Sequence, residues 1–197
     1  MAGKILVTYT TMSGSTTEVA EAIGKALAEG GATVDVKPMP AVTDLSAYDA
    51  FVLGGPMIVG WHRGAAQFVT LHQAALSQKP VAFFVTCLSL TDDGQETISG
   101  APLYLDPTAA TPPKVAGKLT FVEKMGTPAN HLGGLLAKVP NVHPVSVGFF
   151  GGKLDYSVLN PLAWLFVRII IRGKAGDYRN WDAINTWAAS LPPLLSA

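Results

Sequence analysis

Hydrophobic residues in this chain form short β-branched runs that alternate with stretches of helical spacing. Residues 5–9 are apolar and uncharged, as in a buried strand, and Val19, Ile23 and Leu27 then recur on one face of a helix. Further strands are predicted at 33–36, 50–53, 81–87 and 144–150, and a last helix at 181–188. Strands that alternate with helices indicate a parallel sheet, and ligands of such sheets lie beyond the carboxyl ends of the strands.

A loop rich in hydroxyl groups connects the first strand to the first helix. Thr11, Ser13, Ser15 and Thr16 supply the hydroxyls, and Gly14 lets the backbone approach an anion. The helix that follows directs unpaired N–H groups and its dipole toward the same place. No lysine follows the glycine and no Gly-x-Gly-x-x-Gly is present, which excludes the triphosphate loop and the dinucleotide fingerprint. The loop predicts a site for one terminal phosphate monoester; the alternative is a capped turn without a ligand.

The sequence of this loop, Thr-Met-Ser-Gly-Ser-Thr at 11–16, resembles the Thr-x-Thr-Gly-x-Thr phosphate loop of flavodoxins. Ser13 stands in place of the middle threonine. The resemblance implies FMN as the cofactor and a three-layer α/β fold, with a five-stranded parallel sheet of order 2-1-3-4-5 and helices on both faces. The phosphate contacts that it implies are Thr11, Met12, Ser13, Gly14, Ser15 and Thr16.

The loop after the third strand, at 54–64, suits a flat aromatic ligand such as the FMN isoalloxazine. Its glycines let backbone groups approach the flavin N5, and its apolar side chains are available to a ring face. The predicted ring contacts here are Gly55, Pro56, Met57, Ile58, Val59, Gly60 and Trp61. The alternative is that the apolar side chains fold back into the core. His62 and Arg63 are either solvated or placed to relay a proton and to meet an anionic substrate.

The loop after the fourth strand occupies the place where flavodoxins hold the other side of the ring. The predicted contacts are Thr86, Cys87, Leu88 and Ser89. Flavodoxins usually place a tyrosine here, whereas no aromatic residue follows this strand closely, which leaves an open face for a substrate. Cys87 is predicted to be a small buried residue and not a nucleophile, because no His or Asp lies beside it.

A long excursion at 95–141 separates the fourth strand from the fifth. Residues 96–105 are predicted as a helix, and the remainder, which has many Gly and Pro residues, is typical of a lid or a partner surface. His131 has no companion ligand, so no metal site is expected.

A second insertion, at 151–180, precedes the last helix. A helix is predicted at 158–172, apolar around nearly its whole circumference and broken only by Arg168 and Arg172. Its apolar stretch is shorter than the roughly 20 residues that span a bilayer. It therefore lies in a membrane surface, in a dimer interface or over the flavin site, or it is an ordinary core helix.

Four features together resemble the flavodoxin-domain protoporphyrinogen oxidases, the quinone-linked dehydrogenases of haem synthesis. They are residues 55–60, the Gly-Gly-x-Leu-Asp-Tyr sequence at 151–156, the apolar and basic helix, and the Asp-x-Arg sequence at 177–179. The similarity covers essentially the full chain. It implies FMN binding, membrane association and electron transfer to a quinone.

Composition narrows the class of partner. The 197 residues are 49% hydrophobic and 14% charged with a net charge of zero, and no basic block exists to neutralise nucleic-acid phosphates. The length fits a single domain. The single cysteine fits a reducing compartment and the first residues lack a leader pattern, so a cytoplasmic protein is expected, peripheral at the inner face of the membrane. The residues that precede 151 are close to charge balance, without the acidic docking face of soluble flavodoxin carriers.

These observations predict an FMN-dependent oxidoreductase that takes electrons from a reduced tetrapyrrole or related apolar substrate and passes them to a quinone. Arg63, Arg168 and Arg172 are the candidates for contacts with substrate carboxylates or lipid phosphates. The alternatives are an electron-carrying flavodoxin, an NAD(P)H-dependent quinone reductase and a binding module that has lost its flavin. Association into a homo-oligomer through 158–172 is the alternative to a membrane contact.

Overall fold

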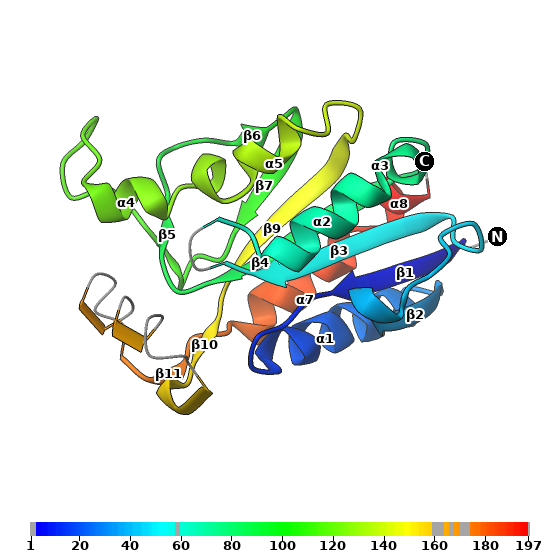
Figure 1. Ribbon diagram of the computed structural model, residues 1–197, viewed down its shortest axis with the longest axis horizontal. Helices are drawn as coiled ribbons and strands as arrows, with labels where there is room; N and C mark the ends of the chain where they lie inside the picture. Colours follow the sequence, from blue (N-terminus) through cyan, green and yellow to red (C-terminus); the bar gives the residue numbers. More distant parts are fainter. Residues whose placement is uncertain (1–2, 58–59, 159–163, 166–167, 170–173, 197) are drawn as a thin grey trace.

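The computed structural model describes residues 3–57, 60–158, 164–165, 168–169 and 174–196 (Figure 1). Its strands are β1 (Lys4–Tyr9), β2 (Thr33–Pro38), β3 (Ala50–Pro56), β4 (Val81–Cys87), β5 (Leu90–Thr91), β6 (Thr97–Ile98), β7 (Ala101–Leu105), β8 (Ala110–Thr111), β9 (Pro144–Gly151), β10 (Lys153–Leu154) and β11 (Gly176–Asp177). Its helices are α1 (Ser15–Glu29), α2 (Arg63–Leu71), α3 (Gln73–Leu76), α4 (Phe121–Met125), α5 (Gly134–Leu136), α7 (Trp181–Ser190) and α8 (Pro192–Leu195). Short 3-10 or π turns are η1 (Met39–Ala41), η2 (Ala129–Gly133) and η3 (Tyr156–Val158).

The main sheet has the strand order β2-β1-β3-β4-β9-β7-β6 in the described part of the chain. Its first five strands are parallel and confirm the predicted order 2-1-3-4-5. β3 continues three residues beyond the predicted strand and takes Gly54, Gly55 and Pro56 into the sheet, where Pro56 pairs with Thr86. The carboxyl ends of β1, β3 and β4 therefore lie side by side at one edge.

The helix predicted at 96–105 is wrong, because these residues form the hairpin of β6 and β7. The turn between the two strands is Ser99-Gly100, with φ of 49° and 83°. Positive φ at both central residues is the geometry of a type I′ turn, whose twist matches that of a hairpin. Pro102 lacks the N–H that a helix interior requires. β7 then pairs in parallel with β9 and extends the sheet.

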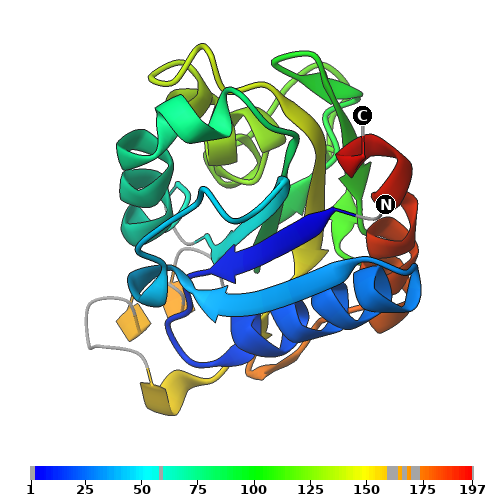
Figure 2. The same ribbon diagram turned by 90° about the vertical axis from the view of Figure 1, so that its right-hand side faces the viewer.

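Helices cover both faces of the sheet, as predicted. Figure 2 shows α1 along one face and α2 with α3 along the other. On the first face α1, α7 and α8 enclose a core in which the Trp187 indole N–H donates to Ser146 Oγ at 2.9 Å. On the second face α2, α3 and α5 enclose a core that includes Leu132, Leu135 and Leu136 of the excursion. This part of the excursion is core and not a lid.

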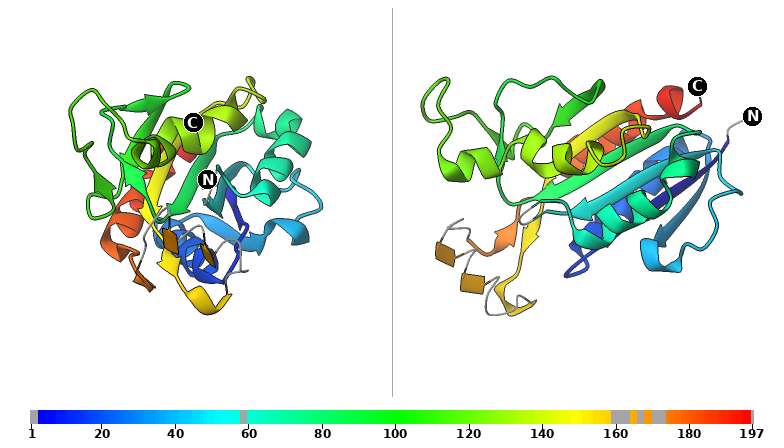
Figure 3. Two further views of the ribbon diagram at one scale, coloured as in Figure 1. Left: turned by 60° about the vertical axis from the view of Figure 1, so that its left-hand side comes forward. Right: turned by 45° about the horizontal axis from the view of Figure 1, so that its top comes forward.

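Two segments project beyond the carboxyl ends of the strands (Figures 1 and 3). One carries α4, and the other is the second insertion, which begins and ends at the antiparallel pair β10 and β11. Most of the helix predicted at 158–172, including Arg172, lies outside the described residues. Among the residues that are described, no helix is long and apolar enough to cross a membrane.

Candidate functional site

The hydroxyl loop has the backbone of an anion cradle. Gly14, with φ of 85°, precedes α1 and has no side-chain cap, while its own N–H donates to Thr11 Oγ1 at 2.9 Å. Met12, Ser13 and Gly14 are exposed. The N-terminus of the 15-residue helix α1 thus opens on the loop, where its N–H groups and dipole favour an anion.

Two threonines of this region direct their hydroxyls inward. Thr16 is fully buried, and its Oγ1 forms a hydrogen bond of 3.2 Å with Thr86 Oγ1 at the end of β4. Thr10 is 8% exposed, and its buried Oγ1 has no partner among the described residues. An unpaired buried hydroxyl is costly unless a ligand satisfies it. Thr10 was not among the predicted contacts, and its place at the end of β1 is the signal that marks it.

Close backbone approach defines the loop that follows β3. A Cβ on Gly55 would lie 2.8 Å from Thr10 Oγ1 and 3.1 Å from Trp61 Nε1, and a Cβ on Gly54 would overlap the ring of Phe84. Trp61 Nε1 donates to the Gly55 carbonyl at 3.2 Å. Only glycine fits at these two positions, so the backbone at the end of β3 packs directly against the side chains of Phe84, Thr10 and Trp61.

Met57 and Trp61 fold back into the core, which was the alternative for this loop. They are 6% and 7% exposed, and the Trp61 ring lies 5.4 Å from that of Phe83. Gly60 has φ of 77° and Pro56 is half-buried. Ile58 and Val59 lie outside the described residues. Met57 and Trp61 therefore support the loop from the side of the core.

The loop after β4 holds Leu88 and Ser89, which are both half-buried. Cys87 is buried, its Sγ lies 3.6 Å from the Phe150 carbonyl, and burial raises the pKa of its thiol to about 12. The prediction that Cys87 is a small buried residue is confirmed, and a thiol with a raised pKa is neutral at pH 7.

The excursion braces both loops. Thr91 N donates to the Gly126 carbonyl at 2.9 Å, and Trp61 N donates to the His131 carbonyl at 3.2 Å. A Cβ on Gly126 would lie 2.9 Å from Ser89 Oγ. Residues 126–131 thus fix the separation of the two loops that were predicted to hold the ring.

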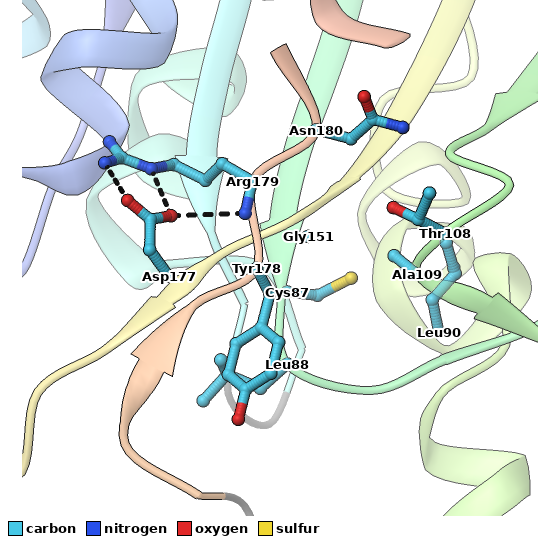
Figure 4. A pocket seen from close by; sticks show the side chains of 10 residues that line it. All are labelled: Cys87, Leu88, Leu90, Thr108, Ala109, Gly151, Asp177, Tyr178, Arg179 and Asn180. Atoms are coloured by element: carbon cyan, nitrogen blue, oxygen red, sulfur yellow. Dashed lines mark hydrogen bonds and ion pairs between the residues drawn. The ribbon is translucent and has the colours of Figure 1, made fainter. Parts of the chain in front are cut away.

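A cavity of about 500 Å³ opens at the carboxyl ends of β4 and β9 (Figure 4). Its lining is Cys87, Leu88, Leu90, Thr108, Ala109, Gly151, Asp177, Tyr178, Arg179 and Asn180. Tyr178 comes from the end of the insertion and is 46% exposed. It places beside Leu88 the aromatic ring that the segment after β4 lacks, and no local sequence pattern marked it.

A buried carboxylate joins the segments around this cavity. Asp106 is fully buried, and its Oδ1 accepts from Thr108 N at 2.9 Å, Thr108 Oγ1 at 2.8 Å and Asn180 Nδ2 at 3.0 Å. Its Oδ2 accepts from Gly151 N at 3.3 Å. Asn180 also caps α7, since its Oδ1 accepts from Ala183 N at 3.2 Å. Asp106 therefore connects the ends of β7 and β9 to the start of α7.

Arg179 ties the end of the insertion to the hydroxyl loop. Its side chain is 4% exposed and forms ion pairs with Asp177 at 2.5 Å and Glu18 at 3.0 Å, and its Nη1 donates to the Ser15 carbonyl at 3.1 Å. Hydrogen bonding to Asp177 raises the pKa of Arg179, and the same bond lowers the pKa of Asp177. These contacts hold the first turn of α1 against the returning chain.

The predicted substrate residues lie on separate segments. Arg63 is exposed at the first position of α2, and Arg168 lies in the insertion with its guanidinium 5.3 Å from the Trp164 ring. His62 caps α2 by accepting from Gly64 N at 3.2 Å, and burial lowers its pKa. Arg172 lies outside the described residues. Within the described ranges, no group of three His, Cys, Asp or Glu side chains is placed to hold a metal ion.

A family model described as a flavodoxin domain matches residues 6–180. Among solved structures, the chain is similar to rubredoxin oxygen:oxidoreductase of the anaerobe Desulfovibrio gigas, with a TM-score of 0.51 and 14% identity over 98% of this chain and 36% of that one. It thus spans about a third of the length of that protein. It is equally similar to a flavodoxin from the domain Archaea, with a TM-score of 0.51 and 11% identity over 98% of this chain and 99% of that one. No protein of curated function matches its sequence.

Proposed function

The chain belongs to the flavodoxin-domain family and is an FMN-binding electron-transfer protein, and from that premise we propose that it is an oxidoreductase. It oxidises an apolar, acidic substrate of the protoporphyrinogen type and passes the electrons to a quinone. Bound FMN would supply a hydride acceptor at N5 and a route for the electrons to an acceptor, and the proton that the substrate also loses would pass to water. The residues of this chain bind the cofactor, exclude water from it and orient the two reactants.

The described residues fit FMN. The hydroxyls of Thr11, Ser13 and Ser15 and the open first turn of α1 would hold its phosphate, and the unpaired Thr10 hydroxyl lies between the loop and β3. Thr16 and Thr86, which were both predicted as contacts, would instead hold the loop against β4 through their mutual hydrogen bond. The ring would lie between the loops after β3 and β4, whose separation the excursion fixes.

The observation that carries the enzymatic part of the proposal is the exposed apolar surface at this end of the molecule. Most of the large apolar side chains that are exposed among the described residues lie on segments that border the carboxyl ends of the strands: Met12, Val115, Leu119, Phe121, Trp164, Leu165, Ile169, Tyr178 and Trp181. Only Leu71 and Leu194 of that set lie elsewhere. An exposed apolar surface of this kind suits reactants that partition out of water, whereas soluble electron carriers bind their partners through charged surfaces.

Basic side chains accompany the apolar ones. Lys114, Lys118 and Lys124 lie in the segment of α4, and Arg168 and Lys174 lie in the insertion, all of them exposed. Apolar side chains with basic neighbours are typical of surfaces that contact anionic lipid. This supports a peripheral contact with the inner face of a membrane, where a quinone is dissolved; a second copy of the chain is the alternative partner for the insertion.

Anaerobic reduction of the FMN-loaded protein tests the reaction. Protoporphyrinogen is expected to bleach the flavin absorbance, and a soluble quinone added afterwards is expected to restore it. NADPH and dithionite serve as the parallel reductants. Bleaching by NADPH alone would favour a quinone reductase, and reduction by dithionite alone, in two separate one-electron steps, would show an electron carrier; either result overturns the proposal.

A further inference from the structure

A second cavity, of about 740 Å³, lies between α2 and the segment of η2 and α5, on the face of the sheet opposite α1. Its lining is Gly60, Trp61, Arg63, Ala66, Gln67, Thr70, Leu71, Asn130, His131, Gly134, Leu135 and Lys138. We call it the α2–α5 groove. Its volume falls within the range of small-molecule sites, which is about 300–1,000 Å³.

The charge of the groove has one sign. Arg63 and Lys138 are exposed at its rim, and none of the lining residues is acidic. Both flanking segments lead away from the edge where β3 and β4 end: α2 follows β3, and α5 leads to the start of β9. Arg63 is the first residue of α2 and Lys138 follows the end of α5, so the two cations come from different flanking segments of the groove.

A buried polar side chain belongs to the lining as well. His131 is 3% exposed, and neither ring nitrogen forms a hydrogen bond of normal geometry with the described residues. Its ring lies 5.6 Å from that of Phe149, and its carbonyl accepts from Trp61 N. Burial lowers the pKa of His131 to about 4, against a smaller opposing effect of the Ser89 main chain. The imidazole is neutral at pH 7, so it has one donor and one acceptor, and at least one of the two lacks a partner among the described residues.

We propose that the α2–α5 groove binds an elongated apolar molecule that carries an acidic group, with its body against Trp61, Leu71 and Leu135 and its acid at Arg63 or Lys138. The lining matches both halves of such a molecule, and an oxygen on its body would give His131 a partner. The groove includes Gly60 and Trp61, which belong to the loop after β3, so its occupant would lie close to the proposed cofactor site. The proposal holds whichever donor reduces the flavin.

Equilibrium dialysis of the FMN-loaded protein tests it with two matched probes. These are 8-anilinonaphthalene-1-sulfonate and N-phenyl-1-naphthylamine, which share the same aromatic rings but differ in the sulfonate. FMN occupies the cofactor site, so neither probe enters there. The sulfonate probe is expected to bind more tightly. Lys138→Gln and Arg63→Gln are each expected to weaken it about threefold to fivefold and to leave the neutral probe unchanged.

Two controls separate the groove from the general surface. Lys25→Gln removes another exposed lysine, on α1, and is expected to change neither dissociation constant. Ala66→Trp fills the groove and is expected to abolish binding of both probes, with folding checked by circular dichroism; if that variant does not fold, the two charge variants decide alone. Equal affinity for the two probes, or equal losses in Lys25→Gln and Lys138→Gln, would overturn the proposal. Because dialysis measures no electron transfer, its failure is distinct from failure of the proposed reaction.

Discussion

Replacing Asp106 by alanine tests whether its buried carboxylate holds the cavity segments together. The substitution removes the acceptor of four hydrogen bonds and leaves the buried Gly151 N–H and the half-buried Asn180 amide without a partner. A buried donor left unpaired costs about 1–3 kcal/mol, so the expected loss in the free energy of unfolding is about 3–5 kcal/mol. At a urea dependence of about 2 kcal/mol per M, the unfolding midpoint falls by about 2 M.

Urea titration followed by circular dichroism measures this loss, at one fixed FMN concentration because bound ligand adds to stability. Asp155→Ala is the matched control. Asp155 accepts from Ser157 N at 2.9 Å and Oγ at 2.6 Å, the same local pair that Asp106 makes with Thr108, but it is exposed and forms no long-range hydrogen bond with the described residues. A much smaller midpoint shift is expected for it. Equal shifts in the two variants would refute the reasoning, since the local turn would then account for the whole effect.

Two further predictions follow from burial and exposure. Because burial lowers the pKa of His131 from 6.5 to about 4, the unfolded chain binds more protons between these values, and the free energy of unfolding falls as pH drops from 6.5 to 4, on the order of 3 kcal/mol in full. That contribution is fully present above pH 6.5; His131→Phe is expected to flatten the profile, and parallel profiles would contradict the assignment. The double variant Trp164→Ser with Leu165→Ser is expected to lose sedimentation with vesicles that contain anionic lipid, while Leu71→Ser, which is 78% exposed on α2, is expected to retain it. Equal losses would place the lipid contact elsewhere.

The central strands β1, β3 and β4 of the parallel sheet could be predicted from the sequence because they are buried on both faces. β4 begins and ends at the predicted residues, and every side chain in it is buried, which agrees with its nearly continuous apolar sequence. The hydroxyl loop and the loops after β3 and β4 were located by the same topology, since parallel strands end at a common edge.

The parts that sequence reasoning missed depend on long-range contacts. The Ser99-Gly100 turn lies in a stretch without clear periodicity. The residues around it form strands because β7 pairs with β9 at the edge of the sheet. The sequence is equally compatible with Trp61 as a ligand contact or as a core residue. Its hydrogen bond to the Gly55 carbonyl places its ring in the core. Tyr178 is far in sequence from Leu88, so no local pattern could bring the two into one cavity.

The paired strands β10 and β11 have a consequence for how such a chain can be rebuilt. Lys153 lies opposite Asp177 and Leu154 opposite Gly176, so the chain leaves the body and returns to it at a single point. A segment attached through one two-stranded stem can be shortened, exchanged or acquired without altering the order of the main sheet, because joining the stem by a tight turn closes the same register. The stem is thus a natural junction at which the same flavodoxin-like sheet can carry inserted segments that contact different partners.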